Sequence, residues 1–104
     1  MRIDIRGRHL DVTDRFRAYI ERRLVFALGR FSERIRLITV RLLDVNGPRG
    51  GVDKACEVVV SLVRGRTLAV RDIDSGLYAA VDRSTNRAGR AVAARIRRGR
   101  EVRI

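Results

Sequence analysis

The chain has 104 residues, enough for one domain around one hydrophobic core but not for two. Its 24 basic residues, all arginine except Lys54, outnumber 12 acidic ones, and the resulting net charge of +12 indicates a polyanionic partner, with nucleic acid ahead of a membrane surface. A single cysteine, Cys56, excludes an internal disulfide, and no apolar run approaches the roughly 18 residues of a membrane span, so we expect a cytoplasmic protein.

The first elements predicted along the chain are a strand and a helix. Charged and apolar residues alternate over 2–6, as they do in a half-buried strand. Thr13 is a suitable N-cap, so we predict a helix over about 14–29, where Gly29 would let the chain leave the helix. The predicted apolar stripe of this helix consists of Phe16, Ile20, Leu24, Ala27 and Phe31.

Three more strands follow this helix. The segment 34–45 is rich in β-branched and aliphatic residues, which favour a strand. The glycines and proline of 46–51 predict a turn into a third strand over 55–63. A tight Arg64-Gly65-Arg66 connection then leads into a fourth strand over 67–73.

A second helix is predicted over about 76–98, after start signals at Asp72, Asp74 and Ser75. A frayed basic tail would occupy about 99–104. The order is thus β-α-β-β-β-α. We predict a single α+β domain over 1–104, a two-layer sandwich in which two helices cover one face of a four-stranded sheet.

The second helix carries the clearest functional signal. At 100° per residue its apolar side chains form one stripe, and a cluster of arginines lies opposite. From residue 83 to residue 104 there are eight arginines and one acid, Glu101, whereas a merely solvated helix usually mixes both signs. The stripe contains Leu77, Val81, Thr85, Ala88, Val92 and Ile96, and the cluster contains Arg83, Arg87, Arg90, Arg97 and Arg98. A solvated face that only keeps the protein soluble is the alternative.

The mode of recognition follows from what these elements lack. The helix has mainly alanine, threonine and valine on its apolar side, which argues against a membrane-surface helix. All five aromatic residues fall in predicted helices or at their ends, which argues against base stacking on the sheet. We therefore expect guanidinium groups to engage the phosphates of folded RNA.

Three motifs together resemble the ribosome hibernation-promoting factor and ribosome-associated inhibitor family. They are GRHLDVTD at 7–14, YIERRL at 19–24 and LYAAVD at 77–82, in the order and on the elements where that family has them. The similarity extends over 1–98, with departures at the loop 46–54, at 25–29, and at Ala88 and Gly89. Because the chain has no long C-terminal extension, the pairing of ribosomes through a second domain is not expected.

The resemblance implies a protein that binds the small ribosomal subunit and its RNA. It would lie over the sites of messenger and transfer RNA, inhibit translation and promote ribosome hibernation under stress. The basic positions that the resemblance implies are Arg17, Arg23, Arg83, Arg87, Arg90 and Arg95. From the residues themselves we add Arg97 and Arg98 of the second helix, and Arg49 and Lys54 of the glycine-rich turn, where backbone amides can approach an anion.

No catalytic chemistry is predicted. Cys56 and His9 could approach each other in space, but a buried thiol and a packed histidine are commoner. Metal ligands with recognisable spacing are missing, and the turn before Lys54 lacks the serine or threonine and the helix of a phosphate loop. We expect no enzyme activity, cofactor, metal or small-molecule substrate. Two alternatives to ribosome binding remain: a general RNA- or DNA-binding module, and an adaptor for an acidic protein.

Overall fold

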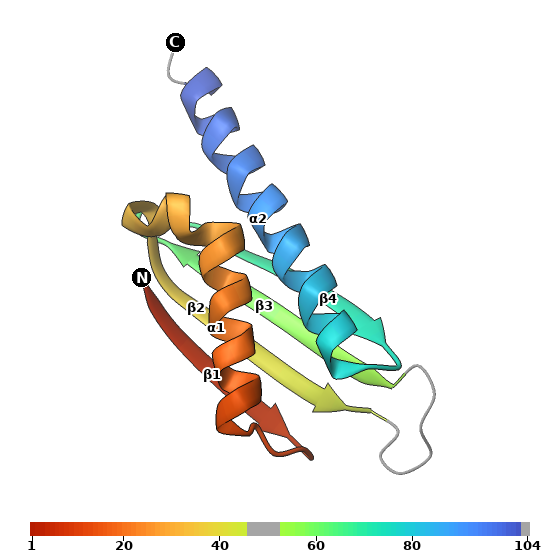
Figure 1. The fold of residues 1–104 in the computed structure, drawn as a ribbon. Coiled ribbons are helices and arrows are strands. Elements are labelled where there is room, and N and C mark those ends of the chain that lie inside the picture. The colour runs from red at the N-terminus through yellow and green to blue at the C-terminus, as the bar shows by residue number, and fades with distance from the viewer. Residues whose placement is uncertain (46–52, 103–104) are drawn as a thin grey trace.

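The computed structural model of the chain describes residues 1–45 and 53–102, with side chains as far as residue 99. Strands and helices follow one another as predicted, with a short 3-10 helix as an addition, so the β-α-β-β-β-α order is confirmed (Figure 1). The elements are β1 (Arg2–Arg8), α1 (Asp14–Leu28), η1 (Gly29–Arg34), β2 (Ile35–Asp44), β3 (Lys54–Leu62), β4 (Thr67–Asp74) and α2 (Leu77–Val102).

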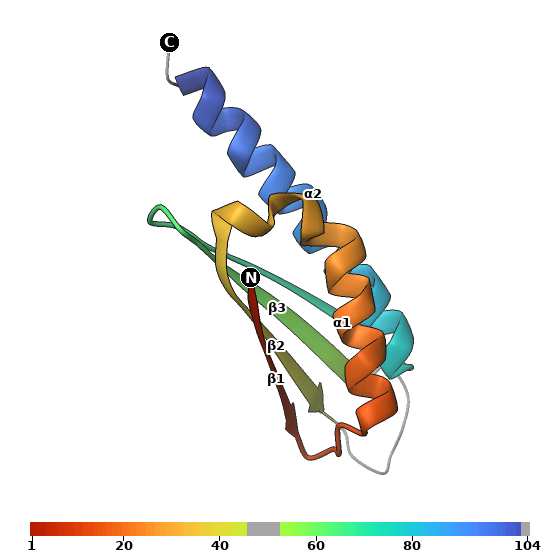
Figure 2. The same cartoon turned by 60° about the vertical axis from the view of Figure 1, so that its left-hand side comes forward.

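The sheet has the strand order β1-β2-β3-β4, with β1 parallel to β2 and the other neighbours antiparallel. A parallel pair needs a crossover, which α1 and η1 provide. Both helices lie on the same side of the sheet, which confirms the two-layer α+β class (Figure 2). β1 extends to Arg8 instead of ending at residue 6, because Arg8 still pairs in register with Leu43 of β2.

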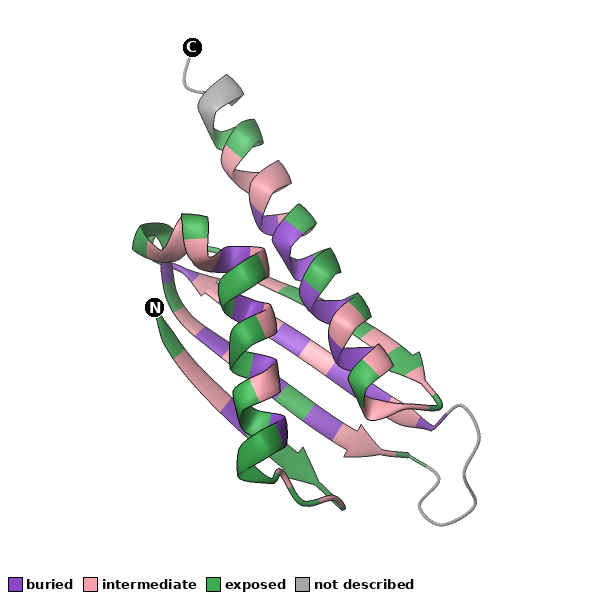
Figure 3. Ribbon diagram, viewed as in Figure 1, coloured by how far each residue is buried: buried purple, intermediate pink, exposed green. Residues whose placement is uncertain are grey.

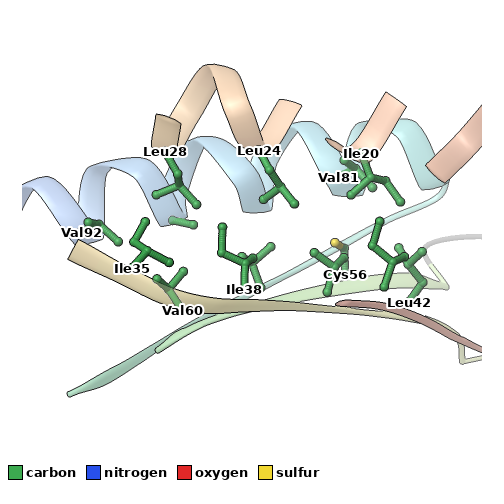
Figure 4. Close-up of a cluster of buried hydrophobic side chains, with 14 of the residues drawn as sticks. Ile20, Leu24, Leu28, Ile35, Ile38, Leu42, Cys56, Val60, Val81 and Val92 are labelled. Carbon is green, nitrogen blue, oxygen red and sulfur yellow. The ribbon is translucent and has the colours of Figure 1, made fainter. Parts of the chain in front are cut away.

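The core fills the space between the helices and the sheet. Side chains alternate along each strand, so Val40, Val58 and Val70 form one row across three strands on the covered side. Val40 and Val58 are fully buried. The buried set that the close-up labels is Ile20, Leu24, Leu28, Ile35, Ile38, Leu42, Cys56, Val60, Val81 and Val92 (Figure 4).

The end of α1 differs from the prediction. Gly29 has φ −57° and ψ −36°, a right-handed conformation, so the chain tightens into η1 rather than leaving the helix through a left-handed glycine. Leu28 is buried, in line with Ile20 and Leu24 at helical spacing, whereas Ala27 and Phe31 of the predicted stripe are only half-buried. The start of α1 is as predicted, because the Thr13 side chain accepts a hydrogen bond from the Phe16 amide at 3.1 Å.

α2 continues to Val102, past the helix end predicted near residue 98, and residues 103–104 of the predicted tail lie outside the described residues. Its start is fixed by Asp74, whose Oδ1 accepts a hydrogen bond from the Gly76 amide at 3.1 Å. Because the sheet ends earlier, the last turns of α2 project beyond it (Figure 1). Arg97 and Arg98 on these turns are therefore presented away from the core.

Close packing between the two helices depends on Gly89. A Cβ atom at this position would lie 2.9 Å from the backbone oxygen of Ala27 in α1. The glycine that departs from the family pattern is therefore explained by the approach of α1 to α2.

Gly89→Ala is expected to destabilise the protein by about 1–2 kcal/mol, since the overpacking cost outweighs the gain in helix propensity. Gly99→Ala on the same helix is the matched control, because a Cβ atom there would meet nothing within 4 Å and the better helix former should stabilise or be neutral. Urea unfolding of both variants measures the difference. Equal free energies of unfolding for the two variants would contradict the proposed packing role.

Candidate nucleic-acid interface

The outer side of α2 presents a row of arginines, which we call the α2 ridge. Buried and exposed residues alternate along α2 (Figure 3). At 100° per residue the ridge falls opposite the buried residues Val81, Thr85, Ala88 and Val92. All members of the ridge are exposed: Arg83, Arg87, Arg90, Arg97 and Arg98. The pattern of a packed face and an opposing cationic face is thus present in the structure as the sequence predicts.

Two members of the ridge are tied to aspartates of β4. Arg83 Nη2 lies 3.5 Å from Asp74 Oδ2, and Arg87 Nη1 lies 3.0 Å from Asp72 Oδ2. Arg87 also donates a hydrogen bond to the backbone oxygen of Arg71 at 2.8 Å. These contacts hold α2 on the edge strand. The side chains of Arg83 and Arg87 remain 63% and 46% exposed, and a guanidinium has five donors, so both can still meet a phosphate.

Asp74 both accepts a hydrogen bond from the Gly76 amide at the start of α2 and pairs with Arg83. Its pKa is lowered chiefly by the hydrogen bond from the Gly76 amide, and the charge of Arg83 lowers it further. A lowered pKa favours the charged carboxylate, so this contact persists at neutral pH and is lost only when the pH falls through the folded-state pKa. The sequence pattern indicates Asp74 as a helix-start signal but gives no sign of its ion pair with Arg83.

The other three members of the ridge, Arg90, Arg97 and Arg98, make no hydrogen bond or ion pair with any part of the chain that the structure describes. They follow the paired arginines along the helix towards its projecting end. Within the described residues these three guanidiniums on one helix face have no carboxylate partner, so they are available to an external anion.

Arg23 lies in the seam between the two helices. Its Nη2 donates to Asn86 Oδ1 at 2.9 Å, and its Nε is 3.4 Å from Asp82 Oδ1. Tyr19 donates a short hydrogen bond to the same carboxylate, which is the main reason that the tyrosine pKa is raised. Arg23 therefore joins α1 to α2, and its side chain is 29% exposed. Arg17, earlier on α1, is exposed.

One apolar side chain stands out beside these basic groups. Phe26 is 80% exposed on α1, and the guanidinium of Arg23 lies 5.6 Å from the centre of its ring. Sequence patterning assigned aromatic residues to the helices, which is confirmed, but gave no sign that this ring points to solvent. All five aromatics lie outside the strands, consistent with the exclusion of a stacking sheet.

The remaining predicted contacts are dispersed. Lys54 is paired inside the protein, with its Nζ 2.8 Å from Asp53 Oδ2 and 3.2 Å from Asp44 Oδ2, and the hydrogen bond to Asp53 is the main cause of its raised pKa. Arg95 is half-buried on the sheet side of α2 rather than on the ridge. Arg49 lies outside the described residues. The structure thus brings together the α2 arginines but places Lys54 and Arg95 elsewhere.

Cys56 is fully buried under α2. Its Sγ accepts a hydrogen bond from Ser84 Oγ at 3.0 Å, and burial raises the pKa of the thiol to about 11. A thiol that stays protonated at neutral pH is a poor nucleophile. His9 is exposed in the turn after β1, where its φ is 63°. It therefore does not act as a buried base for the Cys56 thiol. Within the described residues no cluster of three or more potential ligands could hold a metal ion.

Over the described residues, no helix combines the length and apolar character that crossing a membrane requires. This finding agrees with the absence of a long apolar run in the sequence.

A family model described as "Sigma 54 modulation protein / S30EA ribosomal protein" matches residues 3–100. The chain belongs to this family. Its membership confirms the resemblance inferred from the three motifs. No match was found among curated proteins.

Two solved structures share the fold of this chain. The N-terminal domain of Protein Y from Thermus thermophilus is 31% identical, with a TM-score of 0.73 over 88% of this chain and 96% of that one. A ribosomal subunit interface protein from Coxiella burnetii is 18% identical, with a TM-score of 0.74 over 90% of this chain and 96% of that one. The second likeness concerns the fold alone.

Proposed function

We propose that the protein binds the small ribosomal subunit through ribosomal RNA phosphates and inhibits translation by occluding the channel for messenger and transfer RNA. Idle ribosomes would be kept in hibernation while it is bound. The observation that carries the proposal is the α2 ridge, in which Arg90, Arg97 and Arg98 are exposed and have no ion-pair partner among the described residues. The chain that carries this ridge belongs to a family whose description names a ribosomal protein.

The chemistry of the ridge fits phosphate. Guanidinium groups donate two parallel hydrogen bonds to a phosphate, and release of counterions from RNA supplies much of the binding free energy. The ion pairs of Arg83 and Arg87 with β4 fix the helix, so the other ridge arginines are carried on a rigid body. A rigid, folded block that is anchored by charge can exclude other RNA molecules by its volume alone.

Competition tests ribosome preference. At moderate salt we expect excess transfer RNA or duplex RNA to leave the protein bound to purified small subunits in a sedimentation assay, because the ribosomal site adds shape complementarity to charge. An added messenger RNA and initiator transfer RNA complex should bind less to subunits that carry the protein. Displacement by any RNA in proportion to its phosphate content would instead support a general RNA-binding module and remove the proposal.

A further inference from the structure

A second cationic surface adjoins the C-terminal part of the ridge, at the end of the molecule where β3 turns into β4. A hollow of about 570 Å³ opens there between η1, the β3–β4 turn and the sheet side of α2. Four arginines line it, namely Arg34, Arg64, Arg66 and Arg95. Among the described residues the single carboxylate in its lining is Glu33, so the charges that these residues place around the hollow sum to a positive excess.

The turn holds two of these arginines in place. Gly65 has φ +83°, a conformation that favours glycine, and it separates Arg64 from Arg66. The Leu62 amide donates to the Arg66 oxygen at 2.9 Å, and the Arg66 amide donates to the Arg64 oxygen at 3.2 Å. Both side chains are therefore attached to a short, hydrogen-bonded turn, and both are exposed.

Arg34 is joined to the same turn. Its backbone oxygen accepts a hydrogen bond from the Val63 amide at 2.9 Å, which ties the end of η1 to the end of β3. This backbone hydrogen bond holds Arg34 in place without using its guanidinium group. None of the four lining arginines forms an ion pair among the described residues.

Arg95 approaches from the helix. It follows Ala88 and Val92 at helical spacing on the side of α2 that faces the sheet, but it lies beyond the end of the core. Its Nε is shielded from solvent and has no hydrogen-bond partner in the part of the chain that the structure describes. A shielded guanidinium N–H without an acceptor is unfavourable, and an anionic oxygen in the hollow would satisfy it.

We propose that this hollow binds neighbouring phosphates of an RNA backbone, as a second contact beside the α2 ridge. RNA is the occupant that the observations favour, since Arg98 of the ridge lies within one helical turn of Arg95 and makes the two cationic surfaces continuous. The inference rests on the proposed function for the identity of the RNA, but the site itself is defined by its own residues.

Titration of the full chain with inorganic pyrophosphate tests the site directly. We expect the backbone amides of Gly65 and Gly99 and the Arg95 side-chain Nε–H to shift in nuclear magnetic resonance spectra. Arg64→Ala/Arg66→Ala should weaken this binding by at least about tenfold, since two of the four cations are removed. The matched control is Arg2→Ala/Arg8→Ala, an equal charge change on exposed β1 positions. Absence of these shifts, or equal weakening by both double variants, would overturn the site.

Ribosome binding tests the occupant. In the double variant of the turn, the slope of log affinity against log salt should become shallower by about two, and affinity at about 150 mM salt should fall on the order of tenfold. Pyrophosphate binding combined with an unchanged salt slope would overturn RNA as the occupant. If the unaltered chain fails to bind subunits, the proposed function fails, while the pyrophosphate titration still decides whether the hollow binds phosphate.

Discussion

Replacing Arg90, Arg97 and Arg98 together with glutamate is expected to lower affinity for small ribosomal subunits on the order of ten-thousandfold at about 150 mM salt. Three phosphate contacts are lost, and three carboxylates then repel the RNA. The fold should persist, because these side chains are exposed and form no hydrogen bond or ion pair with the rest of the described chain. Sedimentation of labelled protein with purified subunits measures the affinity, and thermal unfolding checks the fold.

A control with the same charge change separates the ridge from net charge. Arg2, Arg8 and Arg71 are exposed strand residues on or beside the face of the sheet that carries no helix. Their joint replacement with glutamate should reduce affinity by no more than about tenfold, since it alters only long-range attraction. Comparable losses in the two triple variants would mean that overall charge, and not the ridge, drives binding.

Arg83 and Arg87 are poor choices for the same test, although the sequence ranks them with Arg90. A glutamate at either position would face Asp74 or Asp72 of β4. Repulsion between these carboxylates would loosen α2 from the sheet, so lost binding could reflect lost packing. The structure therefore moves the informative substitutions towards the C-terminal half of α2.

Much of the fold follows from local patterns. Period-two alternation located β2 and β3 to within about one residue, and the Thr13 cap located the start of α1. Gly29 was misjudged because glycine permits a left-handed exit without requiring it, and the burial of Leu28 and Ile35 instead favours a continued right-handed turn. The conformation of Gly29 depends on tertiary packing, which local sequence propensity cannot predict.

The candidate site, too, is predictable from the sequence only in part. Helical periodicity is sufficient to place Arg90, Arg97 and Arg98 opposite the packed face, because it needs only the helix geometry. The pairing of Arg87 with Asp72 is beyond such reasoning, since it depends on how β4 lies under α2. The same holds for Arg95, which shares the sheet-facing stripe of the helix yet extends past the strands that would cover it.

Raising the salt concentration from 50 to 200 mM is expected to weaken binding to small subunits by about a thousandfold, provided that about six phosphates are engaged. Exposed arginines that could supply these contacts include Arg17, Arg83, Arg87, Arg90, Arg97 and Arg98. Filter binding or sedimentation at several salt concentrations gives the slope directly.

The glutamate variant of the ridge should show a slope shallower by about three, because each lost contact no longer releases a counterion. This comparison separates contact from steering. Steering by net charge alters the encounter rate at all sites alike, whereas contact with phosphate sets how many counterions leave. A slope that is already shallow in the unaltered protein, corresponding to fewer than about two phosphates, would show that the ridge faces solvent on the ribosome and that binding comes from another surface.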